Sequence, residues 1–237
     1  MRLSDFRALS FDCYGTLIDW ETGLWTALRP LAERAGIARE PALEAFAAAE
    51  SRQERATPAL KYPALLAAVH AQLARAWNVA TDAAEGARFG DSVGDWPAFS
   101  DTAEALRALQ QHYKLVILSN IDRASFARSL PRLGVTFDAV CTAEDIGSYK
   151  PDPRNFAYLI EKLATLGIAR SQALHTAQSL FHDHAPANAA GLASAWIDRR
   201  AGQAGAGATA APPAGVRYDF RFTSLAEMAA ARTAEER

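Results

Sequence analysis

The stretch FDCYGTLID, residues 11–19, ends an apolar run that starts at residue 8, and it places the carboxylate of Asp12 at the end of that run. Gly15 and the hydroxyl of Thr16 follow in a predicted turn, whose backbone N–H groups can receive an anion. A carboxylate at such a position is suited to covalent catalysis as the nucleophile. Because Asp is also a common helix cap and turn former, the assignment depends on the residues that follow the other strands.

Further short runs of strand type cover residues 115–119, 138–142, 174–178, 194–198 and 218–222. Most are too apolar to alternate, which is typical of strands buried on both faces. Helix-length segments separate them, at residues 101–112, 122–133, 155–166 and 182–190, and a last helix follows Ser224. This alternation predicts an α/β fold with a Rossmann-like, doubly wound parallel sheet.

One long interval breaks the alternation. Residues 20–96 contain no convincing strand, but they hold Ala- and Leu-rich segments at residues 23–35, 40–55, 62–77 and 81–93. We therefore expect an α-helical cap at residues 20–96, inserted into a core formed by residues 1–19 and 97–237. The low-complexity run at residues 201–215 predicts a mobile surface loop.

Composition excludes several classes of partner. The chain has 237 residues, with 25 Lys and Arg against 27 Asp and Glu. This balance leaves no basic surface for nucleic acid or for an anionic membrane. The sequence shows no signal peptide and no apolar stretch near the roughly 20 residues that cross a bilayer. Two cysteines form no disulfide framework, so we expect a reduced, cytoplasmic protein.

Polar residues follow four of the predicted strands. Asp12 ends the first strand, and Ser119 with Asn120 ends the next one along the chain. Lys150 comes shortly after the strand at 138–142, and Asp183 shortly after the strand at 174–178. Ligands of open parallel sheets bind beyond the carboxyl ends of the strands, so these side chains are expected on one rim.

Four motifs in this order resemble the haloacid dehalogenase superfamily. They are FDCYGTLID at residues 11–19, LSN at 118–120, YKPDP at 149–153, and Asp183 followed by a helix of small residues. The resemblance extends over nearly the whole chain, including the inserted helical cap. Within the superfamily the chain is most similar to the type II (S)-2-haloacid dehalogenases.

Two positions distinguish this chain from the phosphatases of that superfamily. Phosphatases carry a second Asp two residues after the nucleophile, because an alkoxide leaving group needs a general acid, and here that residue is Tyr14. They also hold Mg²⁺ with an acidic pair in the fourth motif, where this chain has Gln178 before Asp183. A halide leaves without a proton. The resemblance therefore implies a metal-independent enzyme without a cofactor, with Mg²⁺ as the alternative.

The resemblance implies a covalent mechanism on a small 2-haloacid. Asp12 attacks the α-carbon and displaces the halide, and water then cleaves the ester at the Asp12 carbonyl to give the 2-hydroxy acid. The resemblance also implies roles for the other residues. Lys150 keeps Asp12 ionised, and Asp183 orients Lys150 or activates the water. Ser119 binds the substrate carboxylate, and Asn120 donates to the halide. The N–H groups around Cys13 and Tyr14 stabilise the oxyanion, and Thr16 completes the catalytic set.

Other assignments stay open at this point. His182 and His184 flank Asp183, and either could act as the base. The superfamily's dehalogenases have a cap arginine that binds the halide, for which Arg52 and Arg55 are the candidates. Trp20, with Tyr14, is expected to form an apolar wall against the substrate. Leu180 and Phe156 depart from the usual dehalogenase pattern, which predicts a different arrangement around the hydrolytic water.

Two other functions compete with the dehalogenase. The first is a Mg²⁺-dependent phosphatase of the same superfamily, which Asp183 favours and Tyr14 and Gln178 oppose. The second is a catalytically weak binding or regulatory protein, which the altered fourth motif favours and the intact Asp12 and Lys150 oppose. A homodimer is possible, since caps of this kind can close over a substrate or support a dimer contact.

Overall fold

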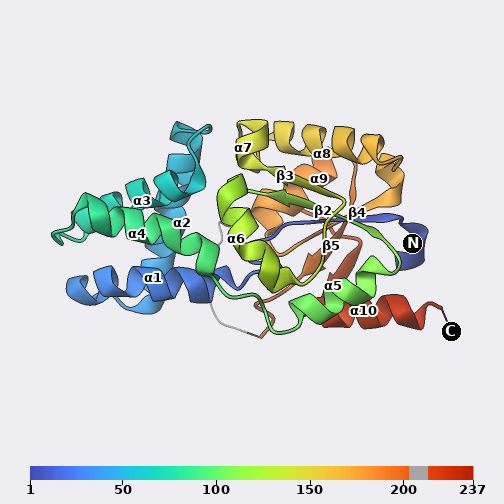
Figure 1. The fold of residues 1–237 in the computed structure, drawn as a ribbon, viewed down its shortest axis with the longest axis horizontal. Coiled ribbons are helices and arrows are strands. Elements are labelled where there is room, and N and C mark those ends of the chain that lie inside the picture. The colour runs from blue at the N-terminus through green and yellow to red at the C-terminus, as the bar shows by residue number, and fades with distance from the viewer. Residues whose placement is uncertain (203–212, 237) are drawn as a thin grey trace.

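The computed structural model describes residues 1–202 and 213–236, so most of the loop expected at residues 201–215 lies outside the described residues. A six-stranded sheet with the strand order β3-β2-β1-β4-β5-β6 forms the centre of the larger lobe (Figure 1). All neighbouring strands are parallel. The predicted α/β class is therefore confirmed. The strands are β1 Ala8–Phe11, β2 Lys114–Ser119, β3 Ala139–Thr142, β4 Ala173–Ala177, β5 Ala193–Ile197 and β6 Phe220–Phe222.

Strand β1 lies between β2 and β4, where the strand order reverses. Phe11 is in register with Ile117 of β2 and with Thr176 of β4. The residues that follow these three strands therefore emerge at the same edge of the sheet. In open α/β sheets the ligand crevice forms at this reversal point.

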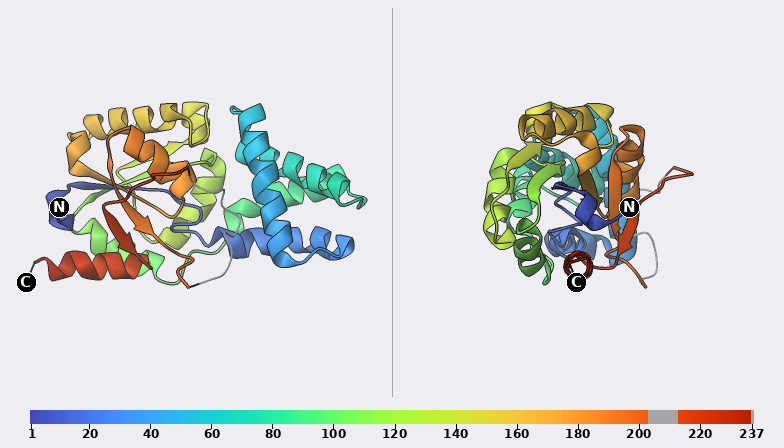
Figure 2. Two further views of the ribbon diagram at one scale, coloured as in Figure 1. Left: turned by 180° about the vertical axis from the view of Figure 1, so that it is seen from behind. Right: turned by 90° about the vertical axis from the view of Figure 1, so that its right-hand side faces the viewer.

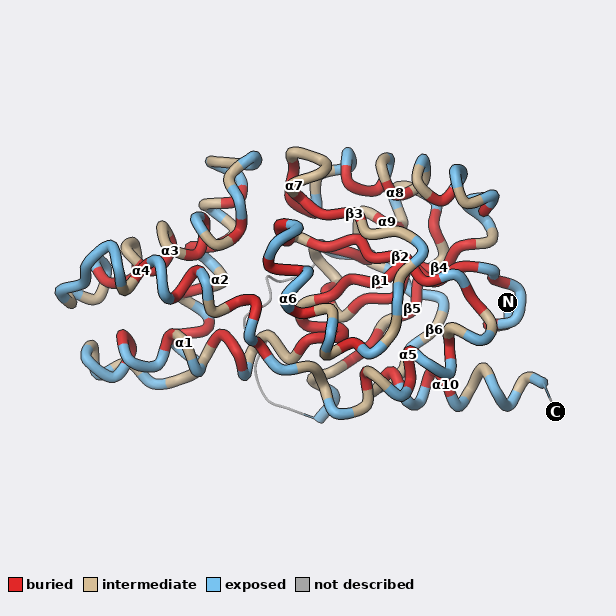
Figure 3. Tube along the Cα trace, viewed as in Figure 1, coloured by how far each residue is buried: buried red, intermediate tan, exposed pale blue. Residues whose placement is uncertain are grey.

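Helices cover both faces of the sheet, as the end-on view in Figure 2 shows. On one face, Leu9, Phe11 and Ile117 pack in one apolar cluster with side chains of α5, α6 and α10. On the other, Ala8 and Val116 pack with α8 and α9. This two-sided burial explains the apolar strand sequences, and it is visible as the buried strands of Figure 3. The helices are α5 Thr102–Gln110, α6 Arg123–Leu133, α7 Ala143–Ile146, α8 Pro153–Thr165, α9 Ala185–Ala189 and α10 Leu225–Ala234.

Four helices fill the segment expected to be a cap and form a lobe at one end of the sheet (Figures 1 and 2). We refer to residues 20–96 as the cap. Its longest helix has 18 residues and carries charged side chains along its length. None of the helices in residues 1–202 and 213–236 is long and apolar enough to cross a membrane. The cap helices are α1 Trp20–Ala35, α2 Arg39–Ala56, α3 Tyr62–Ala76 and α4 Ala83–Asp91.

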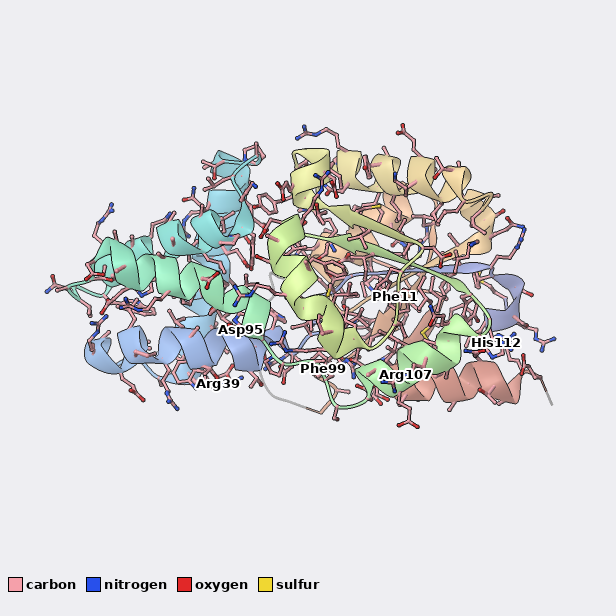
Figure 4. The ribbon with its side chains drawn as sticks, viewed as in Figure 1. Phe11, Arg39, Asp95, Phe99, Arg107 and His112 are labelled. Atoms are coloured by element: carbon pink, nitrogen blue, oxygen red, sulfur yellow. The ribbon has the colours of Figure 1, made fainter. Side chains whose placement is uncertain are left out.

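The two connections between cap and core run side by side. Asp19 N–H donates to Pro97 O at 2.7 Å, and Phe99 N–H donates to Leu17 O at 3.1 Å. Figure 4 shows Phe99 at this junction and Phe11 among the strands of the core. The chain therefore leaves the core and returns to it through a short paired ribbon.

The helix predicted at residues 182–190 begins earlier and is not uniform. A π-helical turn at Leu180–His184 comes first, and α9 follows. The hydroxyl of Ser179 accepts the N–H of His182 at 3.0 Å, which starts the turn ahead of the predicted boundary. Pro186 stands in the first turn of α9. Asp183 consequently lies in the π-helical turn.

Two glycines of α4 show how closely this helix packs on α3. A Cβ on Gly90 would lie 2.1 Å from the carbonyl oxygen of Pro63, whereas one on Gly86 would lie 3.4 Å from that of Ala67. We expect Gly90→Ala to lower the free energy of unfolding by about 1–3 kcal/mol, because the helices must separate. Gly86→Ala should raise it by up to about 1 kcal/mol through helix propensity. Urea unfolding measures both, and equal effects at the two positions would contradict this packing.

Candidate active site

A buried ammonium group joins the two predicted catalytic carboxylates. Lys150 Nζ donates to Asp12 Oδ1 at 2.9 Å, to Asp183 Oδ1 at 2.6 Å, and to Leu118 O at 3.0 Å. The three donors of the ammonium are therefore all used, although the residue is only 1% exposed. A buried charge is tolerated when it is paired and fully hydrogen-bonded in this way.

Each member of this trio comes from a different segment. Asp12 directly follows β1, and its N–H continues the sheet by donating to Thr176 O at 3.1 Å. Asn120, just after β2, holds the backbone of Lys150 with its side chain. It accepts the Lys150 N–H at 2.6 Å and donates to the Lys150 carbonyl at 3.1 Å. Asn120 is thus a clamp that brings the Lys150 loop to the end of β1.

The turn after Asp12 supplies its second hydrogen bond. Thr16 Oγ1 donates to Asp12 Oδ2 at 2.7 Å and accepts the N–H of Gln178 at 3.0 Å. Gly15 has a φ of +103°, and a Cβ there would lie 2.8 Å from Nε1 of Trp20. Only glycine fits this close approach, so the turn needs both Gly15 and Thr16.

Asp183 is also hydrogen-bonded to a fully buried histidine, His175. His175 Nε2 lies 2.9 Å from Asp183 Oδ1, and its Nδ1 lies 3.0 Å from Ser10 Oγ. Because a carboxylate only accepts, Nε2 carries the proton and Nδ1 accepts from the serine hydroxyl. The sequence analysis missed His175; the available signal was a polar residue in the middle of a buried strand, beside Ser10 of the next one.

The two carboxylates differ in basicity. Burial raises the pKa of Asp12 above its ordinary value, with the nearby Lys150 ammonium opposing this. Burial alone would also raise the pKa of Asp183, but Lys150 and His175 together lower it. The two carboxylates more than offset the effect of burial on Lys150 and raise its pKa to about 12. Asp183 is therefore the counter-ion of Lys150, and Asp12 is the more basic and more nucleophilic carboxylate.

A cavity of about 60 Å³ opens above this trio. It brings together most of the residues predicted for the site. Those that line it from the core are Asp12, Tyr14, Ser119, Asn120, Lys150 and Asp183, and Trp20 lines it from the first turn of α1. Ser119 is 2% exposed, and its buried hydroxyl lines the cavity without a hydrogen-bond partner among the described residues.

Other predicted residues lie around the cavity rather than in its lining. Thr16 is buried beneath Asp12, and Cys13 is fully buried, where desolvation raises its thiol pKa. Arg52 is exposed and does not line the cavity, and Arg55 is exposed as well. No arginine of residues 1–202 and 213–236 lines it. The expected cap arginine is therefore not found at this cavity.

Tyr14 lines the cavity, but its hydroxyl is held by another residue. It lies 2.8 Å from Ser129 Oγ of α6, and the ring meets Trp96 edge-on at 6.0 Å between centroids. Burial raises the pKa of Tyr14 well above its ordinary value, so the phenol stays neutral. Tyr14 thus lies at the wall of the cavity, and its contact with a substrate stays a prediction.

The structure separates the two histidines that flank Asp183. His184 is fully buried, with Nδ1 2.9 Å from Ser194 Oγ and Nε2 3.0 Å from Ala177 O. His182 lines the cavity, and its Nε2 has no hydrogen-bond partner among the described residues. Burial lowers the pKa of each to about 4, so both are neutral at pH 7. Only His182 is placed to receive a proton from the cavity.

The cap contributes three cavity residues that the sequence analysis missed, namely Glu50, Glu54 and Tyr62. Glu54 Oε1 accepts from Asn120 Nδ2 at 3.1 Å, and Tyr62 donates to Glu50 Oε1 at 2.5 Å. Residues four apart share a helix face, whereas Arg52, two positions from each glutamate, points to the opposite face. Charged residues in an Ala-rich helix are typical of a solvated surface. The signal that could have indicated the buried face is the four-residue spacing that links Glu50 and Glu54 to the buried Phe46.

Comparison with known proteins identifies the class of the chain. The model of the family described as haloacid dehalogenase-like hydrolase matches residues 6–191. The chain belongs to that family, as its motifs predicted. A search of curated protein sequences found no match.

Several solved structures share the fold over almost the whole chain. A defluorinating L-2-haloacid dehalogenase aligns with a TM-score of 0.75 and 22% identity, covering 97% of this chain and 98% of that one. The L-2-haloacid dehalogenase from Xanthobacter autotrophicus with covalently bound chloropropionic acid has a TM-score of 0.76 and 17% identity, covering 95% and 97%. The HAD-hydrolase YfnB from Bacillus subtilis, bound to magnesium, has a TM-score of 0.74 and 19% identity, covering 98% and 100%.

Removing the ammonium tests the buried trio. We expect Lys150→Met to lower the free energy of unfolding at pH 7 by about 3–5 kcal/mol, because Asp12 and Asp183 then face each other without a cation. The pKa of Asp12 should rise further above 3.8, so the folded variant binds more protons than its unfolded chain and loses stability as pH rises from about 4 to 7. The control is Lys114→Met, which breaks the surface pair with Asp138 and should cost about 1 kcal/mol or less. A pH-independent loss in Lys150→Met would contradict this account.

Proposed function

We propose that this protein hydrolyses the carbon–halogen bond of small 2-haloalkanoic acids through an ester on Asp12. The observation that carries the proposal is the contact of one Lys150 ammonium with both Asp12 and Asp183. This contact keeps the proposed nucleophile, Asp12, buried and paired with a cation. Two positions after Asp12 stands Tyr14, whose neutral phenol is hydrogen-bonded to Ser129. The fold shared with several L-2-haloacid dehalogenases supports the same reaction class.

The first step is a displacement at the α-carbon. An oxygen of Asp12 forms a bond to that carbon while the carbon–halogen bond breaks, and the halide leaves with the electron pair. The Ser119 hydroxyl donates to the substrate carboxylate, and Lys150 provides the nearby positive charge. Each oxygen of Asp12 accepts a hydrogen bond from a fixed donor, which orients it for attack.

The second step regenerates the carboxylate. Water adds to the ester carbonyl of Asp12, and the bond from that carbonyl to the substrate oxygen then breaks. His182 Nε2 takes the proton of the water, because it lines the cavity and has no partner among the described residues. The departing oxygen takes a proton to become the hydroxyl of the 2-hydroxy acid. The configuration at the α-carbon inverts once, in the first step.

The donor set around Asp12 does not fit a Mg²⁺ ion. The position between Asp12 and Asp183 is taken by the ammonium of Lys150. Within residues 1–202 and 213–236 no cluster of three His, Cys, Asp or Glu side chains could hold a metal. Hard dications need several oxygen ligands, so we propose a mechanism that runs without the ion.

Substrate assays with and without a chelator test the proposal. We expect chloroacetate and (S)-2-chloropropionate to release chloride in the presence of EDTA, with the second giving the inverted lactate. Asp12→Asn should abolish release, because the amide is a poor nucleophile. Chloride release and the chirality of the product are measured.

A phosphate ester with Mg²⁺ serves as the matched assay for the rival phosphatase. Phosphate release without any halide release would overturn the proposal in favour of that enzyme. Turnover of neither substrate class would favour a binding or regulatory protein of this family.

A further inference from the structure

Two acidic side chains of the cap line the cavity above Asp12 and lack a cation. Glu50 and Glu54 are 7% and 8% exposed and lie four residues apart on one face of α2. Among the described residues, the basic side chain that approaches either one is His182, whose Nε2 lies 3.9 Å from Glu54. Burial lowers the pKa of this imidazole to about 4, so it is neutral at pH 7. Acidic side chains are almost never fully buried unless they are paired, so the cap side of the cavity needs positive charge.

Each glutamate has one oxygen that accepts a hydrogen bond and one that does not. Tyr62 donates to Glu50 Oε1 at 2.5 Å, and Asn120 Nδ2 donates to Glu54 Oε1 at 3.1 Å. Within residues 1–202 and 213–236, Oε2 of neither glutamate accepts a hydrogen bond. An ionised carboxylate can only accept, so a group that completes these two oxygens must be a hydrogen-bond donor.

The charges of the whole lining show the same lack of cations. The cavity is lined by four carboxylates and one ammonium, those of Asp12, Asp183, Glu50, Glu54 and Lys150. The three donors of that ammonium are all used within the core, so it has none left for the cap. No arginine of the described segments lines the cavity. A ligand that carries only negative charge is therefore repelled from the cap side, whereas a ligand that brings a cation is attracted to it.

Ser119 provides an independent observation on the core side of the cavity. It is 2% exposed, and its hydroxyl lines the same cavity without a hydrogen-bond partner in the part of the chain that the structure describes. This hydroxyl can donate to a carboxylate, whereas the free oxygens of Glu50 and Glu54 can accept from an ammonium. The cavity thus offers a donor from the core and two acceptors from the cap. A small zwitterion, with its carboxylate toward Ser119 and its ammonium toward the cap, matches both sides.

We propose that the substrates of this site are small 2-halo acids that carry a primary ammonium group, and that Glu50 and Glu54 bind this group. The substrate class rests on the proposed function, with Asp12 as the nucleophile. An aliphatic amine is protonated at pH 7, and its three donors can serve the free oxygens of both glutamates. The cavity of about 60 Å³ restricts the ligand to a short chain, such as that of 3-amino-2-chloropropanoate.

The bound ammonium also changes the surroundings of the leaving group. In an in-line displacement the halide departs from the side of the α-carbon opposite Asp12, which is the cap side of the cavity. Ionised Glu50 and Glu54 repel this anion, and the ammonium of the substrate offsets that repulsion. The ammonium is not consumed. Asp12 bonds to the α-carbon, the halide leaves with the electron pair, and water cleaves the ester to the amino-substituted 2-hydroxy acid, so that one water is consumed and one halide and one proton are released.

Two substrates of nearly equal shape test the assignment. Chloride release at pH 7 is measured from 3-amino-2-chloropropanoate and from 2-chlorobutanoate, in which a methyl group replaces the ammonium. We expect kcat/KM of the wild-type chain to be about 10-fold or more higher for the amino compound, as for a hydrogen bond to a charged group. Glu50→Gln and Glu54→Gln should each remove most of this preference, while retained turnover of 2-chlorobutanoate reports that the variant is folded. The control Glu44→Gln, at an exposed position of the same helix, should keep the preference.

Binding of the halogen-free analogues separates this proposal from the proposed function. Affinities for 3-aminopropanoate and for butanoate are measured by calorimetry, and we expect the ammonium compound to bind about 10-fold or more tightly.

The outcomes assign each failure to one of the two proposals. Chloride release from 2-chlorobutanoate without any preference for the ammonium compounds, in turnover or in binding, would overturn the ligand class while the proposed function stands, and would show that protons neutralise Glu50 and Glu54. A preference that survives in both glutamate variants would overturn their role. Tighter binding of 3-aminopropanoate with no chloride release from either substrate would refute the proposed function and support the ligand class. Equal binding with no chloride release would refute both.

Discussion

The buried ammonium of Lys150 is the constraint on which the site depends. A charge in the interior is costly unless several partners surround it, and here the partners come from the ends of β1 and β2 and from the π-helical turn. These segments must meet at one point for the charge to be satisfied. Asp183 in turn needs His175, and Asp12 needs Thr16, so the same requirement extends into the sheet and the first turn. The same hydrogen bonds therefore stabilise the fold and hold the two carboxylates in position.

The residues that line the cavity from the core were predictable from the sequence, because the topology of a parallel sheet determines where they lie. Parallel strands present their carboxyl ends on one edge, so Asp12, Ser119 and Asp183 could be grouped from the strand pattern alone. Lys150 was harder, since it follows β3 at a distance along the chain, and the family resemblance supplied its role. The structure gives the physical reason for its position, which is the clamp formed by Asn120 on its backbone.

The residues that line the cavity from the cap were not predictable in the same way. The periodicity of α2 defines which residues share a face, but the face that meets the core depends on how the cap docks. The sequence analysis therefore singled out neither Glu50 nor Glu54 and gave Arg52 as a candidate halide ligand, although Arg52 lies on the opposite face of the helix from the two glutamates. The cavity combines a lining from the core that contains Asp12, Lys150 and Asp183 with a lining from the cap that contains Glu50 and Glu54.

The paired ribbon between cap and core has a consequence for how such proteins diversify. Because Ile18 pairs with Ala98, the inserted segment begins and ends at adjacent points. Segments whose ends lie together can be lengthened, shortened or replaced without disturbing the structure that receives them. Asp12, Lys150 and the side chains that support them belong to the core, whereas Glu50 and Glu54 belong to the inserted segment. Exchange of residues 20–96 can therefore change the cap side of the cavity while the arrangement of Asp12, Lys150 and Asp183 in the core is retained.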